Sequence, residues 1–351
     1  MDAPIKRPLS PYDRFDLSKF VLHLDDMAPP PSTAHNSPAE ISHWIQAAGP
    51  IETSELQWIQ SAMTQLLRTN SSTINGARQW LGIDGPPMSG KTFSAVVAAM
   101  RIDTQLRISQ TGDVEDPFEH IPVVIVSGNL GEPALARTLL DNIARFIGVV
   151  LPSGLSAAIE ATARHLKNVG TLLIVVDDAH FIKRKSGSRN LTDALKDIIT
   201  TIPASFVFVG AGLEVSALLH VPTGSGETTK RAFDSAKAQK LERDQYSAVY
   251  QLRERLSFHS VKLFPSEMGR VHPVLRNRMT TLINELDRID GFDASALRSE
   301  QALERFSARS LGKTGLALRL ITRTAAAAAE TGASPTLDHV SAVTGLEISD
   351  D

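Results

Sequence analysis

The segment DGPPMSGKTF, residues 84–93, has the residue types and spacing of a loop that binds phosphate groups. Gly85 is followed, after four residues, by Gly90, Lys91 and Thr92, which is the pattern Gly-x-x-x-x-Gly-Lys-(Ser/Thr). In a chain of this length the pattern is expected by chance only about 0.01 times. The two glycines allow backbone N–H groups to point into a phosphate-sized cavity beside a helix N-terminus, whose dipole favours anions.

The loop therefore predicts a site for ATP and Mg²⁺. Lys91 is expected to neutralise the β and γ phosphates, and the Thr92 hydroxyl to ligate Mg²⁺. The alternative is a Gly-Pro turn that only opens a helix. The residues expected to contact the nucleotide are Gly85, Pro86, Pro87, Met88, Ser89, Gly90, Lys91 and Thr92.

Two adjacent acids follow the apolar run LLIVV further along the chain. Asp177 ends the run, where a carboxylate on the Mg²⁺ side is needed, and two neighbouring carboxylates are costly unless a cation or water lies there. Asp178 is placed to polarise an attacking water, which favours hydrolysis over binding alone. Asp is one methylene shorter than Glu, so we expect slow turnover that assembly stimulates. The alternative is an acid pair that caps a turn.

Arginines supply a third group of candidate catalytic residues. Arg253 and Arg255 lie in QLRERLSFHSVKLF, before an expected last strand, where an arginine can stabilise a phosphoryl group held by a neighbouring subunit. Arg319 comes one turn after Gly315, where it could reach the γ-phosphate. For all of them the alternative is a surface arginine on a helix.

The elements that must position these residues alternate between strands and helices. Continuous apolar runs at 121–127, 171–178 and 204–212 are separated by helical periods, and RQWLGID leads into the glycine-rich turn. Continuous rather than alternating apolar strands indicate a parallel sheet covered on both faces, in a three-layer α/β domain. After Pro265 only helical segments follow, one with five consecutive alanines.

Composition limits the remaining function classes. The 351 residues include no cysteine, which excludes disulfides, thiolate metal sites and cysteine nucleophiles. There is no run of about 18 apolar residues, so we expect no membrane span and a cytoplasmic protein. The net charge of −3 argues against coating nucleic acid through bulk positive charge. Local basic strips remain, at 183–189 and 230–243, each of which is alternatively a solvated surface.

In combination these residues resemble the AAA+ ATPases, and among them the transposition helpers of the TniB type, relatives of MuB, IstB and TnsC. The quoted matches are GIDGPPMSGKT, GTLLIVVDDAHFI, ASFVFVGAGLE and QLRERLSFHSVKLF, of which the last aligns Arg255 with the arginine that acts in trans. The helix TGLALRLITRTAAAAAETGA resembles the lid helix of the family and carries Arg319 as its second sensor.

The chain also departs from this family. Asp178 stands where the family usually has Glu, and Leu256 where it has Phe. Ala211 and Gly212 occupy the place of the polar first sensor. The resemblance implies a P-loop NTPase core of the AAA+ type at residues 51–265, a Pro-rich arm at 1–50 and a small helical lid subdomain at 266–351.

The resemblance implies an ATPase that forms a homo-oligomer, as a ring or a helical filament, on duplex DNA. Such an assembly selects target DNA and activates a transposase, and ATP hydrolysis controls its disassembly. Its basic residues would contact DNA phosphates without reading sequence. The leading candidates for these contacts are Lys183, Arg184, Lys185 and Arg189. The alternatives are a nucleotide-switched signalling or defence ATPase and, more remotely, a small-molecule kinase.

Overall fold

The computed structural model divides into two compact units. It describes residues 10–14, 16, 37–47, 50–73, 78–111, 120–128, 135–179, 189–213, 254–267 and 270–345. The first unit comprises Met1–Val21, Leu56–Gly85 and Lys91–Ser260; the second comprises Leu22–Glu55, Pro86–Gly90 and Val261–Asp351. The central part of the phosphate loop, Pro86–Gly90, thus groups with the C-terminal helices. The division expected from the sequence, at residue 265, assigns this segment to the core instead.

The first unit is built on a parallel sheet, as the sequence predicts. Its strands are β1 (Trp80–Asp84), β2 (Val123–Ser127), β3 (Leu173–Asp177), β4 (Ser205–Gly210) and β5 (Leu256–Ser260), in the order β2-β3-β4-β1-β5. All described strand pairs of this sheet are parallel. Every residue of β1, β3 and β4 is buried, because these strands are covered on both faces, whereas β5 is partly exposed at the edge.

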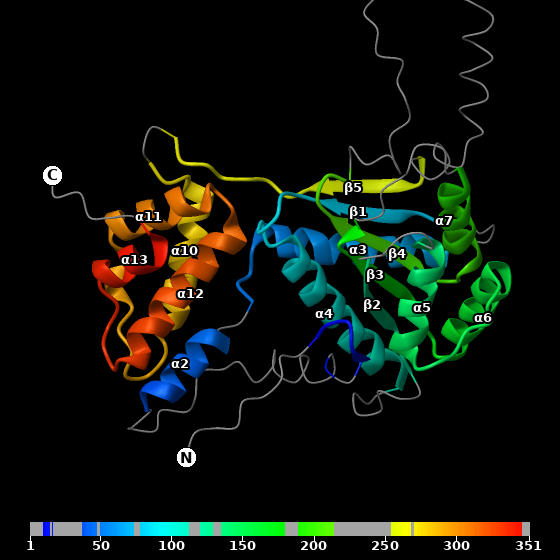
Figure 1. Ribbon diagram of the computed structural model, residues 1–351, viewed down its shortest axis with the longest axis horizontal. Coiled ribbons are helices and arrows are strands. Elements are labelled where there is room, and N and C mark those ends of the chain that lie inside the picture. Colours follow the sequence, from blue (N-terminus) through cyan, green and yellow to red (C-terminus); the bar gives the residue numbers. More distant parts are fainter. Residues whose placement is uncertain are drawn as a thin grey trace, which may run out of the picture. The chain divides into compact units, whose positions relative to one another are not determined.

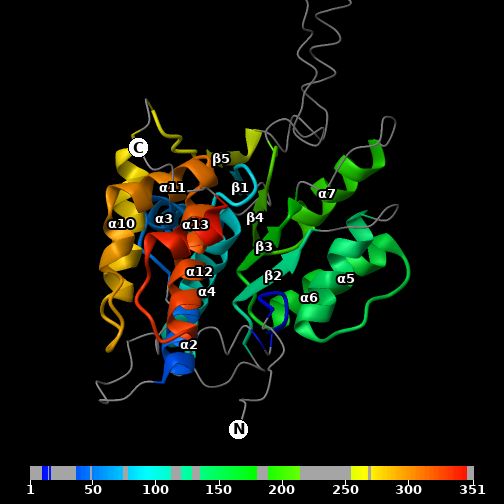
Figure 2. The same cartoon turned by 60° about the vertical axis from the view of Figure 1, so that its left-hand side comes forward.

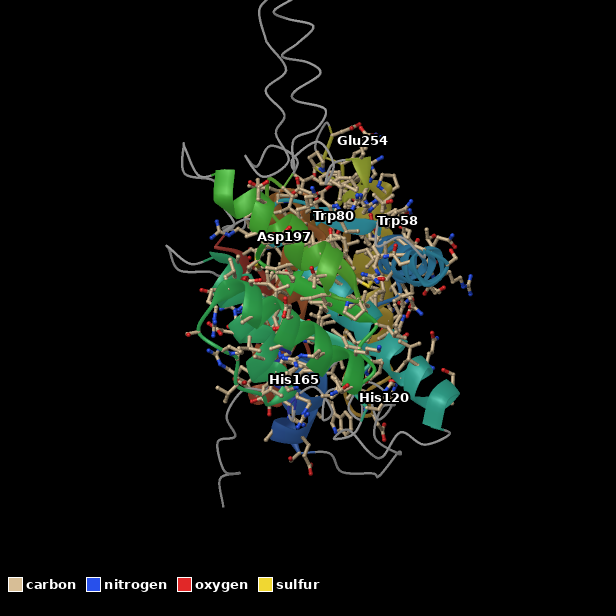
Figure 3. All side chains as sticks on the ribbon, turned by 90° about the vertical axis from the view of Figure 1, so that its right-hand side faces the viewer. Trp58, Trp80, His120, His165, Asp197 and Glu254 are labelled. Carbon is tan, nitrogen blue, oxygen red and sulfur yellow. The ribbon has the colours of Figure 1, made fainter. Side chains whose placement is uncertain are left out.

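Helices cover both faces of this sheet, which confirms the three-layer α/β fold. They are α3 (Ser54–Ser71), α4 (Lys91–Thr111), α5 (Leu135–Ile147), α6 (Leu155–Asn168) and α7 (Arg189–Thr201). Figures 2 and 3 show α3 and α4 on one face of the sheet and α5, α6 and α7 on the other. In α5 the helical spacing of Leu139, Ile143 and Ile147 places all three in the core.

Polar and aromatic contacts attach α3 to the sheet. The Asn70 side chain donates to Gln79 O at 2.8 Å and to Ser205 Oγ at 3.0 Å, and it accepts from Gln79 N at 2.8 Å. Trp58, labelled in Figure 3, stacks on His259 of β5 with 3.8 Å between ring centroids. These contacts hold the helix against the starts of β1 and β4 and against the edge strand.

The second unit is helical and has its own hydrophobic core. Its elements are α2 (Pro38–Ala47), α10 (Pro273–Leu286), the 3₁₀ helix η2 (Ser295–Arg298), α11 (Glu300–Ser310), α12 (Thr314–Glu330) and α13 (Leu337–Thr344). Helix α2 packs along α12 (Figure 1). The alanine run of α12 explains this contact, because Ala325, Ala328 and Ala329 are buried and have side chains small enough for close approach. In the described part of the chain no helix is both long and apolar enough to cross a membrane.

A buried arginine organises the polar contacts of this unit. Arg278 of α10 donates to Thr314 Oγ1 at 2.8 Å and forms an ion pair with Glu55, and its guanidinium lies 4.6 Å from the centre of the Phe264 ring. Burial alone would raise the pKa of Glu55, but the hydrogen bond and charge of Arg278 outweigh it and lower that pKa. Arg278 therefore connects the start of α3, α10 and the first turn of α12.

We expect Arg278→Met to lower the free energy of unfolding by about 3 kcal/mol, because it leaves the half-buried Glu55 carboxylate without its partner. The measurement is denaturant unfolding monitored by circular dichroism. Arg276→Met is the matched control: this arginine lies two residues away on α10 and pairs with Glu300 at the surface, with 2.6 Å between Nη1 and Oε2. Equal losses in the two variants would contradict the organising role of Arg278.

Candidate nucleotide-binding site

Acidic side chains gather at the carboxyl ends of the central strands in the first unit. Asp84 ends β1, Asp177 ends β3 and Asp178 follows directly, while β4 lies between those two strands. The carboxyl edge of a parallel sheet is the usual place for ligands in open α/β folds. This edge also leads into the glycine-rich loop, which begins immediately after β1.

Lys91, the first residue of α4, lies among these acids. Its side chain is buried, which lowers its pKa, and the carboxylates of Asp177, Asp178 and Asp84 counter part of this effect. Lys91 thus supplies a cation in the first turn of α4, and a helix N-terminus favours anions. A lysine in this position can balance phosphate charge, as the sequence predicts.

Thr92 and Asp177, the two predicted Mg²⁺ ligands, are brought together by α4 and β3. Thr92 Oγ1 donates to Asp177 Oδ1 at 2.9 Å, and Asp177 is only 2% exposed. Mg²⁺ prefers oxygen ligands and usually keeps several waters, so a hydroxyl, a carboxylate and nucleotide phosphates suit it. The residues present therefore fit a magnesium–nucleotide complex.

A tyrosine from the N-terminal segment also reaches Asp177. The Tyr12 hydroxyl donates to Asp177 Oδ2 at 2.7 Å. Burial raises the pKa of Tyr12, and the hydrogen bond to Asp177 and the nearby charges of Asp177 and Asp178 raise it further. The phenol consequently stays protonated at neutral pH and serves Asp177 as a hydrogen-bond donor.

Asp84 connects the start of the phosphate loop to the end of β4. Its Oδ1 accepts hydrogen bonds from Gly85 N and from Gly212 N, both at 2.7 Å. Gly212 lies in the segment where a polar first sensor would be expected. The structure therefore places a carboxylate from β1 beside a segment whose own side chains carry no polar group.

The central part of the phosphate loop, Pro86–Gly90, groups with the second unit. Gly90 has a φ of 97°, a conformation that residues with a Cβ rarely adopt, and Met88 is left-handed with a φ of 65°. Ser89 Oγ is buried and has no hydrogen-bond partner among the described residues. A buried hydroxyl of this kind, in a loop of the predicted phosphate-binding pattern, fits a ligand that accepts or donates a hydrogen bond.

The first turn of α12 packs directly on this loop segment. Leu316 N donates to Met88 O at 3.1 Å. A Cβ at Gly315 would lie 2.8 Å from Met88 O, closer than real Cβ contacts allow, and 3.0 Å from Gly90 N, which is tighter than most. Glycine at position 315 is therefore required for the close approach of the two backbones.

Asp178 adopts a left-handed conformation, with a φ of 55°, directly after the strand. Such backbone strain in a non-glycine residue is concentrated at functional sites. Its carboxylate is close enough to raise the pKa of both Tyr12 and Lys91. The structure thus places Asp178 near Tyr12 and Lys91, while its role in polarising water stays a prediction.

The predicted arginines come from other elements of the chain. Arg255 is half-buried just before β5, where its carbonyl accepts from Trp80 N at 2.9 Å, and Arg319 is exposed on α12 of the second unit. Arg253, Lys183, Arg184, Lys185 and the strip 230–243 lie outside the described residues, as does the side chain of Arg189, which begins α7. The catalytic and DNA-contact roles of all these residues stay predictions.

Two residues of the site were not predicted from the sequence. The sequence could have identified Asp84 as a site residue, because it is an acid at the end of an apolar strand immediately before the loop. It could not have identified Tyr12, because Tyr12 lies in an irregular segment without hydrophobic periodicity, and only the tertiary fold brings it to Asp177.

Comparisons with known proteins bear on the fold that carries this site. A family model described as an AAA domain matches residues 74–219. The ORC1 protein of Aeropyrum pernix, solved in complex with DNA, is 14% identical with a TM-score of 0.52, over 88% of this chain and 69% of that one. Cdc6p from Pyrobaculum aerophilum is also 14% identical, with a TM-score of 0.48, over 81% of this chain and 64% of that one. Among curated proteins, none matches the chain by sequence.

These findings agree with the AAA+ part of the predicted resemblance, in the fold and over residues 74–219. The chain has the α/β fold of a P-loop NTPase of the AAA+ type, and the matched domain supports nucleotide binding and hydrolysis at the level of the family. The narrower resemblance to transposition helpers stays a prediction.

Asp84→Ala is expected to lower the free energy of unfolding by about 2 kcal/mol, because the N–H groups of Gly85 and Gly212 lose their acceptor. Asp84→Asn is the control, since the amide keeps a carbonyl oxygen and removes only the charge. Denaturant midpoints measure both. If the alanine variant is no less stable than the asparagine variant, Asp84 does not tie β4 to the loop.

Proposed function

We propose that this chain is a DNA-binding AAA+ ATPase that uses ATP and Mg²⁺ to assemble on duplex DNA and regulate transposition. The observation that carries the ATPase part is the convergence of Lys91, Thr92 and Asp177, on α4 and β3, beside the glycine-rich loop. A Gly-Pro turn that only opens a helix would not need a buried lysine and a buried carboxylate at the same edge of the sheet. The match of residues 74–219 to an AAA domain supports the same reading.

Each residue then has a defined task. Lys91 binds phosphate oxygens, and Thr92 and Asp177 hold the metal, which supplies charge neutralisation on the phosphates. Asp178 accepts a hydrogen bond from the attacking water and orients it. Arg255 stabilises charge in the site of a neighbouring subunit, and Arg319 does so within the same chain. Because Asp178 is shorter than the usual Glu, hydrolysis is slow and the nucleotide acts as a timer of assembly.

Other observations support the DNA-binding and transposition parts of the proposed function. Motifs such as VVDDAH and QLRERL resemble those of the TniB-type helpers. A chain with the same fold, the Aeropyrum pernix ORC1 protein, was solved in complex with DNA. DNA phosphates would be contacted by Lys183, Arg184, Lys185 and Arg189 without sequence readout. The partner of the assembly would be a transposase.

The deciding experiment is electron microscopy of the protein with duplex DNA and a non-hydrolysable ATP analogue. We expect rings or helical filaments on DNA for the wild type and none for Lys91→Ala, whose nucleotide affinity should fall at least about tenfold because a charged hydrogen-bond donor is lost. Lys167→Ala removes an exposed lysine of α6 and should assemble normally.

Two outcomes would contradict different parts of the proposal. Unchanged nucleotide affinity in Lys91→Ala would reject the phosphate-loop assignment. Normal nucleotide binding without any assembly on DNA would reject the DNA-binding role and favour a signalling or defence ATPase.

Asp178→Asn should bind ATP with near wild-type affinity but hydrolyse it about 10²–10⁴-fold more slowly, because the water loses its base. Arg255→Ala should retain nucleotide binding and also lose hydrolysis. Mixing the two inactive variants should restore part of the turnover, measured as phosphate release, since some interfaces then combine an intact Asp178 with an intact Arg255. Absence of restoration would argue against action of Arg255 in trans.

A further inference from the structure

The described N-terminal residues form a turn that is held by its own hydrogen bonds. Ser10 N donates to Asp16 Oδ2 at 3.1 Å, and Asp16, which is fully buried, donates from its backbone to Asp13 O at 3.1 Å. Asp13 N in turn donates to Ser10 O at 3.2 Å. Tyr12 lies between the hydrogen-bonded residues Ser10 and Asp13, and its phenol reaches Asp177.

The two oxygens of Asp177 have different partners. Oδ1 accepts from Thr92, the contact expected between the two metal-side residues, and Oδ2 accepts from the Tyr12 hydroxyl. In the proposed function Asp177 must also serve Mg²⁺, which normally keeps several of its waters. A phenol hydroxyl, like a water, is a neutral hydrogen-bond donor, so on Oδ2 it could take the place of a magnesium-bound water.

We propose that the Tyr12 hydroxyl stands in for a magnesium-bound water on Asp177 and must leave when a magnesium–nucleotide complex binds. This inference rests on the proposed nucleotide site. The turn of residues 10–16 is then an internal competitor of the metal. Coupling between two binding events is reciprocal. The magnesium–nucleotide complex therefore lowers the affinity of the turn for Asp177 by the same factor by which the docked turn lowers the affinity of the site for that complex.

The test is a comparison of nucleotide affinity with and without the metal. Tyr12→Phe removes only the hydroxyl, so we expect it to bind a fluorescent ADP analogue about tenfold more tightly in excess Mg²⁺ and with unchanged affinity in EDTA, given the usual strength of a hydrogen bond to a charged group. Ser37→Ala is the control. It removes a hydrogen-bonding hydroxyl that contacts Glu40 at the start of α2, and it should change neither affinity.

A second variant and a second measurement separate the proposal from a folding defect. Asp16→Asn weakens the turn without touching Tyr12 and should shift the Mg²⁺-dependent affinity in the same direction. Hydrogen exchange of wild-type peptides covering residues 10–16 should accelerate when Mg²⁺ and the nucleotide are added together, and not with the nucleotide in EDTA.

The outcomes that overturn the proposal are distinct from those that overturn the nucleotide site. If the wild type binds the ADP analogue and Tyr12→Phe leaves the ratio of the two affinities unchanged, Tyr12 is not a competitor. If Tyr12→Phe weakens binding in Mg²⁺, Tyr12 supports the metal instead. If the wild type binds no nucleotide under either condition, the proposed function itself fails.

Discussion

A buried carboxylate at the end of a parallel strand must be compensated, and the first unit is arranged around that requirement at Asp177. The residue is almost fully buried, and hydroxyl groups from α4 and from the N-terminal turn donate to its two oxygens. The positive charge of the Lys91 ammonium interacts favourably with the Asp177 carboxylate. Removing water from this edge of the sheet makes each of these interactions stronger than it would be at a surface.

The sheet provides the rigidity that such a site needs. Its central strands are covered on both faces, so the ends of β1, β3 and β4 keep a fixed spacing. Asp84 and Asn70 use side-chain hydrogen bonds to join strands at opposite ends of the sheet, at Gly212 and at Ser205 respectively. Both residues hydrogen-bond to backbone groups that the regular strand ladder leaves without partners.

The parts that could be predicted from sequence were those with a local physical signature. Continuous apolar strands gave the parallel sheet, and the spacing of Gly85, Gly90 and Lys91 gave the loop, because both depend on neighbouring residues. Tyr12 could not be predicted, since its contact spans 165 positions along the chain and depends on the fold. The grouping of Pro86–Gly90 with α12 was equally hidden, because it is made by backbone atoms that any sequence possesses.

The contact between Leu316 and Met88 has a consequence for how this protein can vary through evolution. It joins an amide to a carbonyl, while the Met88 side chain is 40% exposed. Substitutions at position 88 therefore disturb little packing. Any side chain at position 315, in contrast, would push the two backbones apart. Among homologues, a glycine far downstream of the phosphate loop should persist longer than the residue it faces.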